Sequence, residues 1–211
     1  MFHTIIVEDN RYMQKYLAEM LSKDGDFTVD EVIGDSFEAE KRISDMTDLV
    51  LMDVQTLHNH SGIASGKRIK EQRPQVKVVI VTSLVDPDIL VKAKIGAADS
   101  LWYKDHGSDD LLDVIRRTMA GERVFPDSSP EIELKEMFST DITPRQMQVL
   151  RLFVLGYTYD QIAENMNMTK NGVRWNLDQI IIKGGFNSKH ELLAAVLSNK
   201  LIVDSILKES E

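Results

Sequence analysis

The first 120 residues alternate between two hydrophobic periods, and no other feature constrains the fold as strongly. Short runs rich in valine and isoleucine are nearly continuous in hydrophobicity, as strands buried on both faces should be. Helical patterns fill the stretches between them, so we expect βαβ units and a doubly wound, five-stranded parallel sheet of the α/β class. We predict strands at 3–7, 27–34, 48–52, 76–82 and 100–103, and helices at 10–22, 36–45, 66–73, 87–95 and 109–120.

The pattern changes after residue 120. Residues 121–140 contain two prolines and little periodicity, and we interpret them as a linker with a short helix near 131–138. Residues 141–211 are helical throughout, and cap-forming sequences such as TPRQ (143–146) and TYDQ (158–161) mark where helices begin. The sequence therefore predicts a small all-α domain after the α/β domain of residues 1–120.

Composition excludes several classes of protein. The chain has no cysteine, which rules out disulfides and thiolate metal sites and suits a reducing cytoplasm. No apolar run is long enough to span a membrane, and the N-terminus lacks the pattern of a signal peptide.

Residues 1–140 carry 26 acids against 17 lysines and arginines, whereas residues 141–211 carry eight of each. Only the second part is therefore a candidate for binding nucleic acid, through a local basic face.

Polar residues follow the predicted strands at the point where each strand ends. Glu8 and Asp9 follow the first strand, Asp53 the third, Thr82 the fourth and Lys104 the fifth. In an open parallel sheet the carboxyl ends of the strands form one rim, where ligands bind. We therefore expect three carboxylates, a hydroxyl and an ammonium to lie close together.

Three neighbouring carboxylates repel one another and favour a hard cation such as Mg²⁺. A carboxylate can also accept a phosphoryl group, and a threonine hydroxyl and a lysine ammonium could hold the new phosphate oxygens. Taken singly, each residue has a plainer interpretation: Asp53 as a turn residue, Thr82 as structural, Lys104 as a solvated charge, and the acid pair as a cap for the first helix with Asn10. The combination is what indicates phosphoryl chemistry.

These residues resemble the signature of the bacterial response-regulator receiver domain, a flavodoxin-like fold, and GAADSLWYKD (96–105) resembles its NarL/FixJ branch. The resemblance implies that Asp53 accepts phosphate from a sensor histidine kinase. It also implies that Glu8, Asp9, Asp53 and the backbone of Gln55 bind Mg²⁺, that Thr82 is the switch residue, and that Lys104 pairs with the phosphate.

The loop after Asp53 departs from the family pattern. Thr56 and Leu57 stand where Met-Pro is usual, and the loop LHNHSGIASG (57–66) is about one residue longer than usual. Its two histidines, His58 and His60, could be metal ligands, although exposed loop residues are the commoner case. Leu101 occupies the position of the usual aromatic switch residue, beside Trp102.

Residues 141–203 resemble a LuxR-type helix-turn-helix domain, on the match ITPRQMQVLRLFVLGYTYDQIAENMNMTKNGVRWNLDQIIIK (142–183). Val173, Leu177 and Ile180 recur at helical spacing and are predicted to face the core. The opposite face of that helix would enter the major groove of double-stranded DNA. The predicted DNA-binding residues are Lys170, Asn171, Arg174, Trp175, Asp178, Lys183 and Lys189. Trp175 could equally be a wedge in the core, and Lys183 and Lys189 could simply be solvated.

The last helix, 190–203, has more apolar residues than a four-helix core needs. Leu193, Val196 and Leu197 are therefore candidates for a dimer seam, and a two-fold dimer would read an inverted repeat. Together these features predict a cytoplasmic, phosphorylation-controlled transcription regulator rather than an enzyme. We expect the regulator to form a homodimer when it is activated. Two alternatives stay open: a regulator that answers a ligand or protein partner without phosphorylation, and, more remotely, a Mg²⁺-dependent phosphohydrolase.

Overall fold

The computed structural model describes residues 1–105 and 110–202, which form two compact units that meet between Ser129 and Pro130. This junction lies inside the predicted linker. Each unit has its own core of buried apolar side chains. No helix in the described part of the chain is both long and apolar enough to cross a lipid bilayer.

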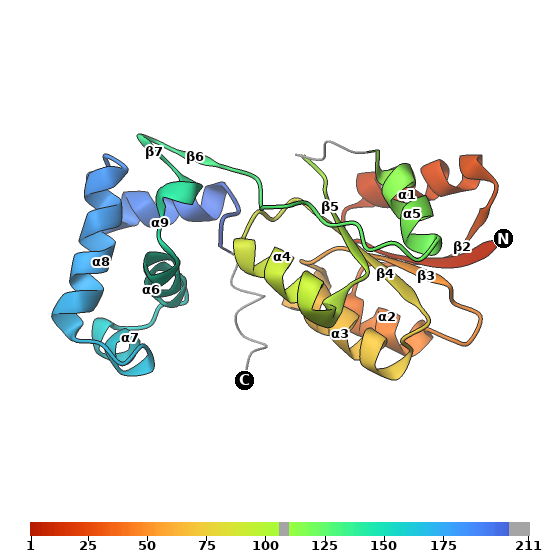
Figure 1. Ribbon diagram of the computed structural model, residues 1–211, viewed down its shortest axis with the longest axis horizontal. Coiled ribbons are helices and arrows are strands. Elements are labelled where there is room, and N and C mark those ends of the chain that lie inside the picture. Colours follow the sequence, from red (N-terminus) through yellow and green to blue (C-terminus); the bar gives the residue numbers. More distant parts are fainter. Residues whose placement is uncertain (106–109, 203–211) are drawn as a thin grey trace. The chain divides into compact units, whose positions relative to one another are not determined.

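The first unit is built on a five-stranded parallel sheet, in the strand order β2-β1-β3-β4-β5. Figure 1 shows α1 and α5 on one face of this sheet and α2, α3 and α4 on the other. The predicted doubly wound fold is therefore confirmed. The strands are β1 (Phe2–Val7), β2 (Phe27–Ile33), β3 (Leu49–Met52), β4 (Lys77–Thr82) and β5 (Ser100–Tyr103). The helices are α1 (Arg11–Asp24), α2 (Ser36–Arg42), α3 (Gly62–Gln72), α4 (Pro87–Lys92) and α5 (Leu111–Met119).

Alternation along the strands divides the apolar side chains between the two faces of the sheet. Ile6 of β1, Leu51 of β3 and Val79 of β4 pack in one cluster with Leu17 of α1 and Val114 of α5. The strand residues on either side of them point to the opposite face and are buried as well. Both faces are thus covered, which explains why the strand sequences are continuously apolar.

The segment after α5 packs against the first unit. The main-chain N–H of Leu101 in the edge strand β5 donates to the carbonyl of Val124 at 3.0 Å, and the N–H of Val124 donates to Ser100 Oγ at 2.9 Å. Farther along, the hydroxyl of Tyr103 donates to Ser129 Oγ at 3.2 Å. Residues 122–129 therefore cover part of the open edge of the sheet, and we call them the edge segment.

The second unit contains a hairpin and helices. The hairpin, β6 (Glu133–Leu134) and β7 (Met137–Phe138), replaces the short helix predicted near 131–138. Lys135 takes a left-handed φ of 62° at the turn, and Leu134 and Met137 are buried, so a turn and packing override the helix propensity of Glu, Leu and Lys. The helices are α6 (Pro144–Val154), α7 (Tyr159–Asn165), α8 (Lys170–Lys183) and α9 (Lys189–Ser198).

The predicted helix starts in this unit are confirmed. Thr143 and Thr158 cap α6 and α7 in capping boxes with Gln146 and Gln161. Thr169 caps α8, which fixes the turn between α7 and α8. These caps give the four-helix arrangement its short connections.

Candidate functional site

The strand ends of the first unit bring an ammonium group against two carboxylates. Nζ of Lys104, just after β5, lies 2.7 Å from Oδ2 of Asp53 and 2.5 Å from Oε2 of Glu8. Glu8 is 1% exposed and Asp53 is 9% exposed, so the three charges are largely shielded from water. The predicted convergence of residues that lie up to 96 positions apart is therefore observed.

Asp9 completes the acidic group. Glu8, Asp9 and Asp53 each offer a carboxylate oxygen, and these oxygens all lie within 4.8 Å of one another. Asp9 is exposed, so an ion could reach the group from solvent. Oxygen donors with open positions for water are what Mg²⁺ requires, and the donor set therefore fits that ion.

The plainer interpretation of Glu8 and Asp9, as caps of the first helix, does not hold. Asn10 is the N-cap of α1, and its side-chain oxygen accepts from the N–H groups of Tyr12 and Met13. The carboxylate of Glu8 instead accepts from the N–H of Asn10 at 3.0 Å through Oε1 and from Nζ of Lys104 at 2.5 Å through Oε2. The carboxylates of Glu8 and Asp9 therefore do not cap α1 and belong to the acidic group at the rim of the sheet.

The electrostatics of this pocket oppose full ionisation. Burial is the main cause that raises the pKa of Asp53, and the charge and hydrogen bond of Lys104 act against it. Burial and then the charge of Asp53 raise the pKa of Glu8. Burial lowers the pKa of Lys104, but the two carboxylates outweigh it and raise that pKa above its ordinary value. Without a further cation, Lys104 is the internal counter-ion of the acids.

Thr82 lies at the rim, but its hydroxyl has another partner in this structure. The side-chain oxygen of Thr82 accepts from the N–H of Leu84 at 3.1 Å. The N–H of Lys104 donates to the carbonyl of Thr82 at 2.8 Å, so the two residues stand side by side at the ends of β4 and β5. The backbone of Gln55 forms an isolated bridge with Ser61, which holds the loop after Asp53.

Gly62 is a site residue that the sequence reasoning missed. A Cβ at this position would lie 1.8 Å from the main-chain oxygen of Asp53, so no other residue fits here. The N–H of Gly62 also donates to the carbonyl of Val54 at 2.8 Å. This close approach lets α3 begin directly beside the end of β3. The helix predicted at 66–73 begins four residues earlier in the structure, at Gly62, and the only signal in the sequence was a glycine a few residues after Asp53.

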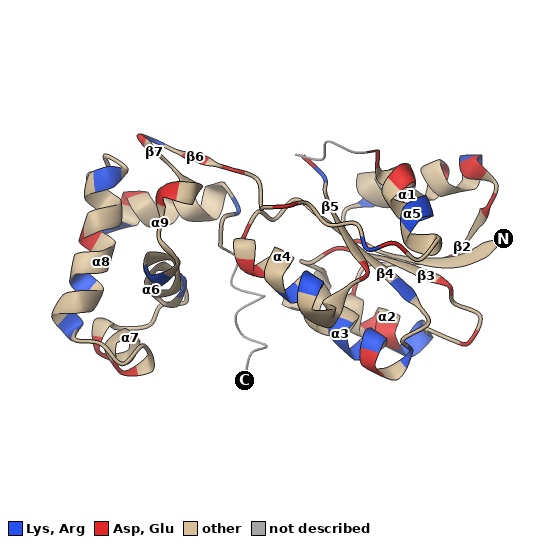
Figure 2. Cartoon of the chain, in the orientation of Figure 1, with Lys and Arg blue, Asp and Glu red and all other residues tan. Residues whose placement is uncertain are grey.

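In the second unit, α8 presents a charged outer face. Val173, Leu177 and Ile180 are buried as predicted, and Trp175 on the opposite side is 59% exposed, which excludes the core wedge. Figure 2 shows basic segments at both ends and near the middle of α8, with an acidic one between them. Exposed members of the predicted set are Lys170, Asn171, Arg174 and Lys183, while Asp178 and Lys189 are half-buried.

Each lysine or arginine of α8 is paired with a carboxylate. Nζ of Lys170 lies 2.7 Å from Oδ2 of Asp160 in α7. Nε of Arg174 lies 3.6 Å from Oδ2 of Asp178, and Nζ of Lys183 lies 3.1 Å from Oδ1 of Asp141. Lys189 instead lies over the ring of Tyr159, with Nζ 4.7 Å from its centroid. Such exposed pairs are weak and can exchange a carboxylate for another anion.

The predicted dimer seam needs a correction. Val196 is fully buried in its own unit, so it contributes to the core and is not available to a partner. Leu197 is 47% exposed and Leu193 is half-buried. The helical phase of α9 explains the error: Leu192 and Val196, four residues apart, form its inner face.

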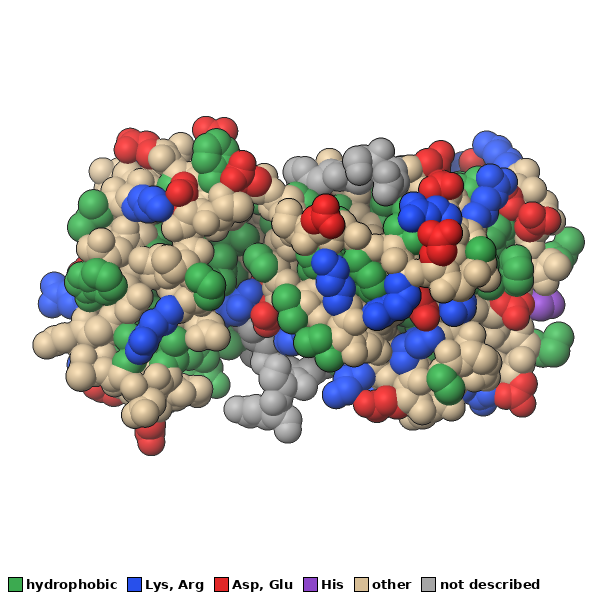
Figure 3. Space-filling view, in the orientation of Figure 1, with side chains coloured by type: hydrophobic (Ala, Val, Ile, Leu, Met, Phe, Trp, Pro, Cys, Tyr) green, Lys and Arg blue, Asp and Glu red, His purple; other side chains and the backbone are tan. Residues whose placement is uncertain are grey.

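On the face drawn in Figure 3, acidic and basic side chains are mixed over the first unit. Around α5 they form ion pairs, with Arg117 lying 3.7 Å from Asp113 and 2.9 Å from Glu122. The excess of acids in the first unit is therefore not gathered into a single-sign patch on that face.

The fold and its acidic rim define the receiver class of doubly wound α/β domains. A family model described as the response regulator receiver domain matches residues 4–116, more than half of the chain. The chain therefore belongs to this family.

Relatives extend the likeness to both units. The response regulator protein VraR of Staphylococcus aureus (strain Mu3) is 26% identical over 211 residues, which cover 94% of this chain and 97% of the relative. A structure of RcsB from Salmonella enterica serovar Typhimurium, bound to the promoter rprA with phosphomimetic BeF3-, covers 94% of this chain and 99% of its own at 19% identity and a TM-score of 0.60. A LuxR-family response regulator from Aurantimonas sp. SI85-9A1 covers 58% of this chain and 87% of its own, at 20% identity and a TM-score of 0.53. Because these two solved structures are only 19% and 20% identical in sequence to this chain, the comparison shows that their folds are alike.

Proposed function

We propose that this chain is a DNA-binding transcription regulator of a two-component system, controlled by phosphorylation of Asp53. In this proposal residues 1–120 are the receiver and residues 141–211 bind DNA. The observation that carries it is the pocket in which Lys104 lies 2.7 Å from Asp53 and 2.5 Å from Glu8. A rigid, shielded carboxylate with a cation beside it is what a phosphoryl acceptor needs.

The reaction is a phosphoryl transfer from a sensor histidine kinase. A carboxylate oxygen of Asp53 forms a bond to phosphorus while the bond from phosphorus to the imidazole nitrogen of the kinase breaks, and that nitrogen keeps the electron pair. Lys104 then pairs with a phosphoryl oxygen in place of the Asp53 carboxylate. Glu8, Asp9, Asp53 and the main-chain carbonyl of Gln55 would hold Mg²⁺, which when bound neutralises negative charge on the phosphoryl oxygens.

The added charge is sensed at the ends of β4 and β5. Phosphorylation adds roughly two negative charges. The hydroxyl of Thr82 leaves Leu84 and donates to a phosphoryl oxygen, and α4, which follows that loop, repacks. The change is a shift in the population of two states of one fold. It favours a homodimer whose α8 helices enter successive major grooves of an inverted repeat.

The proposed contacts to DNA follow the exposed face of α8. Lys170, Arg174, Lys183 and Lys189 would contact phosphates or bases, and Asn171 would bond adenine or phosphate. Trp175 would pack on a sugar or a thymine methyl group, and Asp178 could accept from a cytosine amino group. The dimer seam would use Leu193 and Leu197. A regulator of this kind acts in the cytoplasm, where its kinase and its DNA are found.

Two alternatives make different predictions. A regulator that answers a ligand or partner would not need Asp53, and the unusual loop of residues 57–66 is the feature that favours it. A phosphohydrolase needs a second acid soon after the nucleophile, and Val54, Gln55 and Thr56 follow Asp53 instead. We therefore prefer the phosphorylation-controlled regulator.

The experiment incubates the full chain with acetyl phosphate and Mg²⁺ and measures intact mass. We expect the addition of one phosphoryl group in the wild type and none in Asp53→Ala. Fluorescence anisotropy with promoter DNA should show tighter binding after phosphorylation. Unchanged mass with every donor would favour the regulator that answers a ligand or partner, and hydrolysis of an unrelated phosphate ester over many turnovers would favour the hydrolase.

A further inference from the structure

The loop between β3 and α3 holds two imidazoles that the acidic pocket does not use. The ring centroids of His58 and His60 lie 6.0 Å apart with the planes tilted by 59°. Two imidazoles that share one tetrahedral zinc ion, each with a nitrogen about 2 Å from the metal, have centroids about 5 Å apart. The observed pair is within about 1 Å of that spacing.

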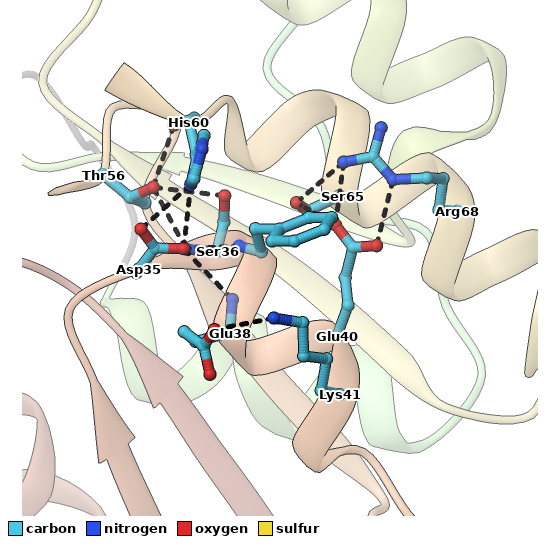
Figure 4. Close-up of polar contacts among 10 residues, drawn as sticks. Asp35, Ser36, Glu38, Glu40, Lys41, Thr56, His60, Ser65 and Arg68 are labelled. Carbon is cyan, nitrogen blue, oxygen red and sulfur yellow. Dashed lines mark hydrogen bonds and ion pairs between the residues drawn. The ribbon is translucent and has the colours of Figure 1, made fainter. Parts of the chain in front are cut away.

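His60 is oriented by a carboxylate. Its Nδ1 lies 2.9 Å from Oδ2 and 3.0 Å from Oδ1 of Asp35, and Figure 4 shows the Asp35 carboxylate facing the His60 ring. A carboxylate accepts hydrogen bonds, so Nδ1 faces the acceptor and Nε2 is the ring nitrogen left to bind an ion. Metal-binding histidines have this arrangement, with one nitrogen on a carboxylate and the other on the ion.

Asp35 is itself fixed. It is 6% exposed and is the N-cap of α2, where Oδ1 accepts from the N–H groups of Phe37 and Glu38. The carboxylate thus anchors the imidazole of His60 to the N-terminal end of α2.

The loop backbone brings the second imidazole to the same place. His58 and Asn59 both take left-handed conformations, with φ of 61° and 58°, which are uncommon for residues other than glycine. The loop is closed by the N–H of Thr56, which donates to the carbonyl of His60 at 3.2 Å, and by the N–H of His60, which donates to the carbonyl of Leu57 at 3.2 Å. His58 is exposed, so solvent reaches the pair.

We propose that His58 and His60 form a binding site for a divalent first-row transition metal ion, Ni²⁺, Cu²⁺ or Zn²⁺, with Asp35 as the positioning residue and water in the remaining positions. Imidazole nitrogens bind these ions more strongly than they bind Mg²⁺. Mg²⁺ instead favours oxygen ligands such as those of the acidic pocket. The site is separate from the phosphoacceptor and does not depend on the function proposed above.

The test is calorimetric titration of the full chain with Ni²⁺ in excess Mg²⁺, which occupies the acidic pocket. We expect one ion per chain, and His58→Ala and His60→Ala should each weaken binding by about tenfold or more. Asp35→Asn should weaken it by about 10- to 100-fold, the usual cost of losing such an orienting carboxylate. Asparagine caps helices as well as aspartate does, so this variant keeps α2 intact.

His3→Ala is the matched control. His3 has a similar exposure and also places Nδ1 on a carboxylate, 3.0 Å from Oδ2 of Asp30, but it lies at the start of β1. Its loss should leave Ni²⁺ binding unchanged. Wild-type affinity in both His58→Ala and His60→Ala, in chains shown to be folded by circular dichroism, would overturn the proposal. Wild-type affinity in Asp35→Asn would overturn the role given to Asp35.

Discussion

The ammonium of Lys104 lies 2.7 Å from the carboxylate of Asp53, although the two residues are 51 positions apart. The same nitrogen also reaches Glu8, so one cation serves two largely buried acids. The pocket is therefore balanced by a residue of the chain itself, and removing that residue should expose the repulsion between the acids.

Lys104→Met should lower the free energy of unfolding of the receiver by about 3 kcal/mol at neutral pH without divalent ions, because it leaves buried carboxylates without a counter-ion. The pKa values of Glu8 and Asp53 are already raised in the folded wild type, and the substitution raises them further. Protonation then removes the repulsion as the pH falls, so the loss should shrink at mildly acidic pH. Urea denaturation at both pH values measures this.

Lys92→Met is the control for that experiment. Lys92 makes an ion pair with Asp88 at 3.7 Å on the surface of α4, and its removal should cost less than about 0.5 kcal/mol at either pH. An equal loss for Lys104→Met at both pH values would contradict the electrostatic account of the pocket.

Mg²⁺ should raise the melting temperature of the receiver. A ligand that binds only the folded state stabilises it by about 2.7 kcal/mol at a concentration one hundred times its dissociation constant. Asp9→Asn and Asp53→Asn should largely abolish the shift, because each removes a carboxylate of the group. Asp30→Asn, outside that group, should retain it. Differential scanning calorimetry gives the comparison, and an undiminished shift in Asp9→Asn would exclude that residue as a ligand.

Gly62→Ala should destabilise the receiver by at least about 2 kcal/mol, because the new methyl group meets a main-chain oxygen that has nowhere to move. Gly172→Ala is the control at another helical glycine. There the nearest atom is the flexible end of Met168 at 3.1 Å, and alanine should stabilise α8 by up to about 1 kcal/mol. Thermal unfolding of both variants tests the contrast, and an unchanged stability of Gly62→Ala would show that α3 can shift away from β3.

Val196→Asp and Leu197→Asp should behave differently although they are neighbours. The first places a charge in the core and should unfold the second unit, since Val196 is fully buried. The second places a charge at an exposed position on α9, so it should preserve the fold. It should weaken dimerisation on DNA. Circular dichroism and analytical ultracentrifugation separate the two effects. Full dimerisation of Leu197→Asp would place the seam elsewhere.

Asp178→Asn should tighten the proposed binding to DNA, because it releases Arg174 from its ion pair and removes a negative charge from the exposed face of α8. Lys170→Gln should weaken binding and reduce the slope of log K against log salt by about 1, the effect of losing one phosphate contact. Fluorescence anisotropy at several salt concentrations measures both. A slope for Lys170→Gln equal to that of the wild type would mean that Lys170 keeps its partner Asp160 in the complex.

The sequence predicted the first unit well because the relevant signals are local. The observed strands differ from the predicted ranges by a residue or two at most, since continuous apolar runs end where the polar rim begins. The rim could be predicted as well: parallel topology alone requires that the residues after β1, β3, β4 and β5 meet at one edge.

The rest depended on tertiary contacts. The hairpin at 133–138 has good helix formers, and the left-handed turn at Lys135 with the burial of Leu134 and Met137 decides against a helix. The side of α9 that faces the core could not be predicted, because apolar residues occur on more than one face of that helix. His60 pairs with Asp35, which lies 25 positions earlier in the chain, before α2 and β3, so the histidines alone could not indicate which carboxylate orients the ring.

The edge segment has a practical consequence for anyone who isolates the receiver. A fragment that stops at residue 120 would lose Val124, whose carbonyl accepts from the N–H of Leu101 and whose side chain is part of the core. Strand β5 would then offer free main-chain groups to a neighbouring molecule, a common start of aggregation. A fragment that ends at Ser129 keeps the edge of β5 covered by residues 122–129. If that fragment is soluble and the fragment ending at residue 120 is not, the insolubility is due to the missing residues rather than to an unstable sheet.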